Sequence, residues 1–169
     1  MTKEEKRITT IKDTLAQLAS KTIVLQAGAG YLSSILKGEL ILEQDHVNVK
    51  DVLPQITCQV CLKGALFFGH VSRHNNCFTN RYGFEIEEVD TKERLISVFS
   101  VLQLDMVEAA FECSVITDDT DQLETFAEGA KITELGEKCV KFGKRFKNDT
   151  NRFKAIMNNM LENKGIFTP

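Results

Sequence analysis

Two histidines one helical turn apart have the spacing that is most typical of a metal site in this chain. His70 and His74 are separated by three residues, so on a helix both imidazoles share one face. Two such imidazoles bind a divalent metal when carboxylates arrive from another element. The carboxylates at suitable helical spacing are Asp105, Glu108 and Glu112. Charged helix faces are usually only solvated, so we predict no metal, and a metal-dependent hydrolase that uses His70 and His74 is kept as an alternative.

The pair Cys58-x-x-Cys61 has a spacing that suits zinc or redox chemistry. A structural zinc site needs a second pair of ligands, and the sequence contains no second C-x-x-C and no C-x-x-H. A thioredoxin-like redox site needs a βαβ pattern around the cysteines, which the sequence does not show. We therefore predict that these cysteines are reduced and buried as small hydrophobic residues.

Positive charge is concentrated in two parts of the sequence. One part is Arg73 and His74 with Arg81, and the other is Lys141, Lys144, Arg145 and Lys147 with Arg152. Arginine forms charge-assisted hydrogen bonds with phosphate, and the neighbouring aromatic rings can stack on a base. The alternative is that these cations only offset acidic helices next to them. The predicted ligand-binding residues are Lys63, His70, Arg73, His74, Arg81, Lys144, Arg145 and Arg152.

The start of the last predicted helix is the strongest single candidate for an anion site. Arg145 and Arg152 flank a helix start at 148–150. The free N–H groups of a first helical turn attract anions, so two guanidinium groups and this turn would converge on one phosphate. This hypothesis treats Arg152 as an exposed residue that contributes little to stability.

No Ser/His/Asp or Cys/His arrangement gives a histidine an identifiable orienting partner, so we predict no catalytic residue and no cofactor. The leading hypothesis is a non-enzymatic binding protein for a small anionic ligand such as a nucleotide. One version of it is a phage-type anti-defence protein that sequesters a host signalling molecule. The alternative is a protein-interaction module that presents the acidic face of Asp105, Glu108 and Glu112.

Length and composition predict one ordinary globular domain, 1–169. The net charge of −3 argues against broad nucleic-acid binding, which needs a large cationic surface. No apolar run is long enough to cross a membrane, and the N-terminus does not resemble a signal peptide. We therefore predict a cytoplasmic protein, and homo-oligomerisation is left open.

Hydrophobic periodicity predicts a mainly α-helical bundle around a central apolar helix at 58–74, with at most a short β-hairpin between 83 and 99. Gly64 and Gly69 leave little bulk on this helix, so a second helix is expected to pack closely against it. Other helices are predicted at 3–20, from a cap at Ser100 through Cys113, and from a cap at 148–150 to a stop at Gly165.

The run Cys61-Leu62-Lys63-Gly64-Ala65-Leu66 and the late Asn148-Asp149 helix cap resemble features of small bacterial and phage proteins of unknown function. These proteins carry a C-x-x-G-A-L core motif and an N-D cap. The resemblance implies a compact, mainly helical fold and an origin in a phage or mobile element. It assigns no catalytic residue.

Overall fold

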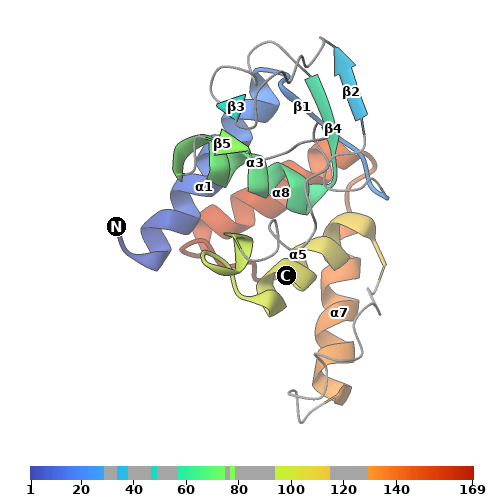
Figure 1. The fold of residues 1–169 in the computed structure, drawn as a ribbon. Helices are drawn as coiled ribbons and strands as arrows, with labels where there is room; N and C mark the ends of the chain where they lie inside the picture. The colour runs from blue at the N-terminus through green and yellow to red at the C-terminus, as the bar shows by residue number, and fades with distance from the viewer. Residues whose placement is uncertain (29–33, 38–46, 49–56, 75–76, 79–93, 115–128) are drawn as a thin grey trace.

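A computed structural model describes residues 1–28, 34–37, 47–48, 57–74, 77–78, 94–114 and 129–169 (Figure 1). This part of the chain is mainly helical, as predicted. The helices are α1 (Lys3–Ala19), α3 (Leu62–His74), α5 (Val101–Glu112), α7 (Gly129–Gly143) and α8 (Asp149–Glu162). The strands are β1 (Ile23–Leu25), β2 (Ser34–Lys37), β3 (Val47–Asn48), β4 (Thr57–Val60) and β5 (Cys77–Phe78). None of these helices combines the length and the apolar character that crossing a membrane requires.

The expectation of at most one short hairpin is wrong, because the described strands form two small sheets. In the first, β4 lies between β1, which is parallel to it, and β2, which is antiparallel. In the second, β3 and β5 pair in antiparallel fashion. Most of the predicted hairpin region, 79–93, lies outside the described residues, and 94–96 form a helical turn.

The predicted helix at 58–74 begins at Leu62, because β4 occupies residues 57–60. Cys58 and Val60 are fully buried and alternate with half-buried residues, which is the period-two pattern of a strand with one face in the core. Four residues are too few to separate this pattern from a helical one in the sequence. Cys61 then starts the helix, since its sulfur accepts a hydrogen bond from the Gly64 N–H at 3.4 Å.

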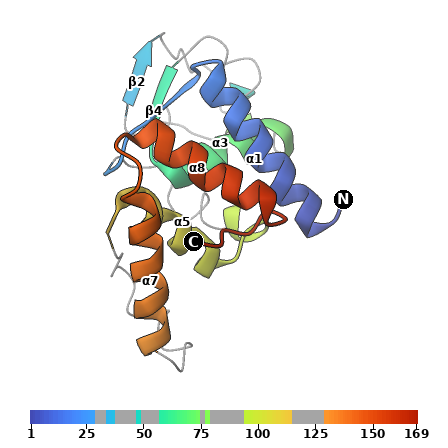
Figure 2. The ribbon, with the colours of Figure 1, turned by 180° about the vertical axis from the view of Figure 1, so that it is seen from behind.

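The predicted close packing of a second helix is confirmed at Gly69, where α1 crosses α3. A Cβ atom at Gly69 would lie 2.0 Å from Thr14 Oγ1 and 2.8 Å from the Thr10 carbonyl oxygen. Only glycine lets the two backbones approach this closely. Figures 1 and 2 show α1 lying beside α3 on one side and α8 on the other.

Two buried threonines in this contact differ in their hydrogen bonding. Thr14 Oγ1 donates to the Thr10 carbonyl oxygen at 2.7 Å, whereas no described residue hydrogen-bonds Thr10 Oγ1. A buried hydroxyl without a partner costs about 1–3 kcal/mol. Thr10→Val should therefore raise the free energy of unfolding by about 1 kcal/mol, while Thr14→Val should lower it. Urea denaturation of both variants tests this, and equal destabilisation by both would contradict it.

Side chains cap three of the described helix starts, and two of these caps, at Ser100 and Asn148, were predicted. Thr2 and Glu5 form a reciprocal capping box on α1. Ser100 accepts from the Gln103 N–H on α5, and Asn148 accepts from the Asn151 N–H on α8. These bonds satisfy first-turn N–H groups that have no partner within the helix.

One hydrophobic cluster connects the sheet to the helices. Its largest fully buried side chains include Phe68 of α3, Phe111 of α5, Phe153 of α8 and Phe167 beyond α8. Phe111 and Phe153 meet edge to face at 6.3 Å between ring centroids, which joins α5 to α8. In both views the C-terminal end of α7 lies against α5, and its N-terminal part projects away from the other described elements (Figures 1 and 2).

Candidate functional site

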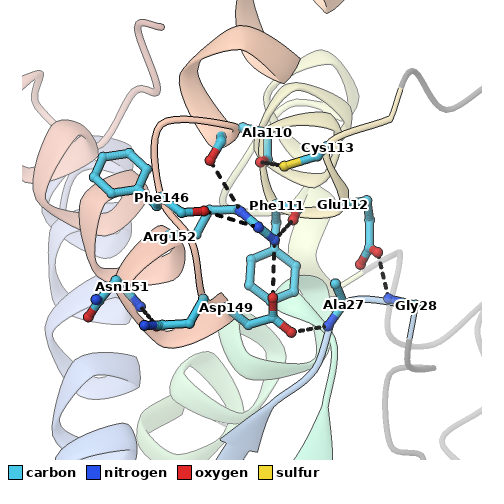
Figure 3. Close-up of polar contacts among 12 residues, drawn as sticks. Ala27, Gly28, Ala110, Phe111, Glu112, Cys113, Phe146, Asp149, Asn151 and Arg152 are labelled. Atoms are coloured by element: carbon cyan, nitrogen blue, oxygen red, sulfur yellow. Dashed lines mark hydrogen bonds and ion pairs between the residues drawn. The ribbon is translucent and has the colours of Figure 1, made fainter.

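Arg152 lies where the C-terminal ends of α5 and α7 meet the first turn of α8 (Figure 3). Its Nη1 donates to the Phe111 carbonyl oxygen at 2.7 Å, and its Nε donates to the Gly143 carbonyl oxygen at 3.3 Å. Its Nη2 donates to the Phe146 carbonyl oxygen at 3.3 Å. Carbonyl groups at helix C-termini have no partner within their helix and carry partial negative charge, so a guanidinium group is well suited to join them. We call Arg152 with these three carbonyls and Asp149 the Arg152 clamp.

The clamp extends to the loop that follows β1. Asp149 accepts from Arg152 Nη1 at 3.1 Å and from the Ala27 N–H at 2.8 Å. The next N–H along the chain, that of Gly28, donates to Glu112 at 2.5 Å. Gly28 has a φ of 73°, a conformation that favours glycine. Two carboxylates, on α8 and α5, therefore bind the loop that follows β1, as the dashed lines in Figure 3 show.

The anion site predicted between Arg145 and Arg152 is not built as expected. The side chain of Arg152 is only 12% exposed, and it donates to three carbonyl groups and one carboxylate of the chain itself. At the start of α8, the Asn148 side chain caps the helix and Asp149 adds a negative charge. The expectation that Arg152 is exposed and structurally unimportant is therefore wrong.

Glu112 is a carboxylate whose surroundings disfavour its charge. Burial raises its pKa above the usual value of 4.5, the Gly28 N–H opposes that rise, and the negative charges of Glu108 and Asp149 add to it. Arg152 opposes the rise more weakly. The folded state therefore holds a proton on Glu112 more tightly than the unfolded chain does.

Because the pKa of Glu112 is raised, this residue makes the stability of the folded protein depend on pH. An acid with a raised pKa in the folded state contributes stability at low pH, and that contribution is lost as the pH rises through the folded pKa. Glu112→Gln keeps an oxygen that can accept from the Gly28 N–H and removes the charge. Its melting temperature should exceed that of the wild type at pH 7, and the difference should shrink toward pH 4. Melting curves between these pH values test it, and a lower melting temperature at pH 7 would contradict it.

Lys63, a predicted ligand residue, lies against the acidic face of α5. Its ammonium group pairs with Glu108, and it lies 3.6 Å from Asp105. Burial alone would lower the pKa of Lys63, but Glu108 and Asp105 outweigh it and the pKa is raised. The same contacts partly neutralise the acidic face that was predicted to bind a basic partner.

The cations around the α7–α8 turn lie on the surface. Lys141, Lys144, Arg145 and Lys147 are all exposed, and we call these four residues the basic corner. The guanidinium carbon of Arg145 lies over the Phe142 ring, 4.2 Å from its centroid. Arg145 Nε also donates to the Phe142 carbonyl oxygen at 3.3 Å. Among the described carboxylates, none forms an ion pair with a residue of the basic corner.

Comparison with known proteins finds no matching family model, no matching curated protein and no matching solved structure.

Of the remaining predicted site residues, His70 alone has a side chain that the structure describes. His70 is buried in α3, with 7% of its surface exposed, so it belongs to the core. Arg73 and His74 lie in the last turn of α3, but their side chains are outside the described residues, as is all of Arg81. Among the described side chains, no three histidine, cysteine or carboxylate groups come together as a metal site.

Four cysteines have described side chains and are free thiols; Cys58, Cys61 and Cys139 are buried, and Cys113 is half-buried. Burial raises the pKa of each of the three buried thiols to about 11. A thiol with such a pKa is almost entirely protonated at neutral pH and is a poor nucleophile. The prediction that Cys58 and Cys61 are buried and reduced agrees with this description.

Proposed function

We propose that this protein binds a small anionic ligand, such as a nucleotide, at the basic corner and catalyses no reaction on it. The observation that carries the proposal is the group of four exposed cations within seven residues, which pair with none of the described carboxylates. Close like charges repel one another, and a phosphate group that contacts them relieves this repulsion.

The Arg152 clamp supports the proposal by holding the turn that carries the basic corner. It binds the carbonyl groups of Gly143 and Phe146, which bracket Lys144 and Arg145 in the chain. The Phe146 N–H also donates to the Gly143 carbonyl oxygen at 3.0 Å. A turn that is already ordered loses less conformational entropy when it binds a ligand. Arg152 thus has a positioning role in this proposal and does not touch the ligand.

Arg145 supports a ligand that carries an aromatic base. One side of its guanidinium group faces the Phe142 ring, and the residue is exposed to solvent. A planar guanidinium group that is packed on one side can stack a base on the other, whereas a lysine cannot. The nearby lysines would then contact the phosphate groups.

Calorimetric titration of the full chain with adenosine monophosphate, ribose 5-phosphate and inorganic phosphate tests the proposal. Each charge-assisted contact is worth about 1.5–3 kcal/mol, so Lys144→Ala/Arg145→Ala should weaken binding of adenosine monophosphate at least tenfold. The matched control is Lys3→Ala/Lys6→Ala, which removes two exposed cations from α1 and should bind as the wild type does.

The titration also separates binding from a purely structural role of the cations. Cations near the C-terminal end of α7 stabilise that helix even without a ligand. If no phosphate compound binds, or if both double variants lose affinity equally, the basic corner serves only this structural role and the proposal is wrong.

A further inference from the structure

Two carboxylates from different helices are held close together by the turn that follows β1. The Ala27 N–H donates to Asp149 at 2.8 Å, and the next N–H, that of Gly28, donates to Glu112 at 2.5 Å. Figure 3 shows both side chains pointing toward this turn. Consecutive Cα atoms lie about 3.8 Å apart, so carboxylates that bind consecutive N–H groups are near neighbours. Like charges so placed disfavour the ionisation of one of the two groups.

The two carboxylates differ in the cations that they meet. Asp149 forms an ion pair with Arg152, whose Nη1 lies 3.1 Å from its Oδ1. Lys63 of α3 pairs with Glu108, one turn before Glu112 on α5. No cation in the described part of the chain forms an ion pair with Glu112 itself. Glu112 is therefore the carboxylate of this pair that keeps a proton.

The groups that face Glu112 from the neighbouring elements agree with this assignment. Burial raises the pKa of Glu112 most, and the negative charges of Glu108 and Asp149 add to the rise. The N–H of the turn and, more weakly, Arg152 oppose it. Burial, with Glu108 and Glu112 adding to it, raises the pKa of the Cys61 thiol before α3 to about 11, so this thiol is uncharged at neutral pH. The bonded arrangement therefore favours the protonated form of Glu112.

We propose that Glu112 is a pH-sensitive latch on the turn of Ala27 and Gly28: with a proton its side chain holds the Gly28 N–H against α5, and once it ionises this bond is broken in a larger share of the molecules. When the bond is broken, the carboxylate is hydrated and farther from Asp149, so ionisation costs less. The latch is thus closed at acid pH and opens as the pH rises through the pKa of Glu112 in the closed arrangement. Asp149 keeps its bond to the Ala27 N–H, so only the Gly28 side of the turn is released.

Amide hydrogen exchange of the full chain, followed by NMR between pH 4 and pH 8, tests the proposal. The protection factor of the Gly28 amide, which corrects for the intrinsic effect of pH on exchange, should fall severalfold over this range. The midpoint of the fall should coincide with the pKa of Glu112, measured from the chemical shift of its carboxyl carbon. Two amides are internal controls and should change much less: that of Ala27, which is bound to Asp149, and that of Cys58, which donates to the Thr22 carbonyl oxygen at 2.9 Å.

Two variants separate the latch from a general effect of pH on the fold. Glu112→Gln has no proton to lose, so its Gly28 amide should keep one protection factor across the range. Glu162→Gln is the matched control at an exposed glutamate of α8 and should behave as the wild type does. The proposal is overturned if Gly28 protection in the wild type does not change, if it falls equally in Glu112→Gln, or if the Cys58 amide loses as much protection as Gly28. A Glu112 pKa at or below 4.5 also overturns it.

Discussion

Replacing Arg152 with alanine should lower the free energy of unfolding by about 3 kcal/mol, because partly buried carbonyl groups lose a charged donor. The side chain joins the ends of α5 and α7 through the Phe111 and Gly143 carbonyl groups. It also pairs with Asp149, which would be left beside Glu112 without its cation. For a chain of this size the loss corresponds to a fall in melting temperature of roughly 6–12 °C.

Thermal and urea denaturation of three variants checks this prediction. Arg152→Lys keeps the charge but lacks the planar fork, so it should lose much of the same stability. Arg145→Ala is the matched control, because Arg145 is exposed and should change stability by no more than about 1 kcal/mol. The prediction is wrong if Arg152→Ala has the melting temperature of the wild type while Arg145→Ala has a lower one. Arg145, and not Arg152, would then be the arginine that stabilises the fold.

The sequence predicts best where neighbouring residues decide the structure. The first helix is found at Lys3–Ala19 against a prediction of 3–20, and the caps at Ser100 and Asn148 are in place. Each depends on residues three or four positions apart. Gln103 stands three residues after Ser100, which is the spacing of a capping box, but its side chain binds the Phe167 main chain instead of the helix start. That partner is far away in the chain, so no local pattern indicates it.

The role of Arg152 could not be predicted, because its partners are main-chain carbonyl groups. These carbonyl groups belong to Phe111, Gly143 and Phe146. The packing of α5, α7 and α8 brings them to Arg152, and the types of these three residues give no sign of this contact in the sequence. Glu112 was predicted as part of an acidic face, and its bond to the Gly28 N–H depends on the end of β1 in the same way. The cluster of positive charges in the sequence did indicate the basic corner. Charged side chains are mostly exposed in folded proteins, so cations that are close together in the sequence usually lie together on the surface.

The position of β4 was missed for a different physical reason. Cys58 and Val60 fit a helical core face as well as a strand, and the choice depends on β1. Three residues of β1 pair with β4 in parallel, from Ile23 with Cys58 to Leu25 with Val60. This pairing joins positions 35 residues apart and satisfies main-chain groups that a short isolated strand would leave open.

Gly143→Ala should destabilise the protein by about 3 kcal/mol or more, although a glycine replaced by alanine in a helix normally gains up to about 1 kcal/mol. A Cβ atom at Gly143 would lie 1.8 Å from the Ala110 carbonyl oxygen and 3.1 Å from Cys113 Sγ. The first of these is a main-chain atom of α5, so no side-chain rotation relieves the overlap. The two helices would have to separate, and the Gly143 carbonyl oxygen would move away from Arg152.

Gly28→Ala is the control for this prediction. No described atom lies within 4 Å of a Cβ atom at Gly28, so this variant carries only the cost of a positive φ, about 1–2 kcal/mol. Denaturation curves should therefore rank Gly28→Ala between the wild type and Gly143→Ala. A Gly143→Ala variant as stable as the wild type would mean that α5 and α7 do not approach this closely in solution, and the Arg152 clamp would then lack the geometry on which the basic corner depends.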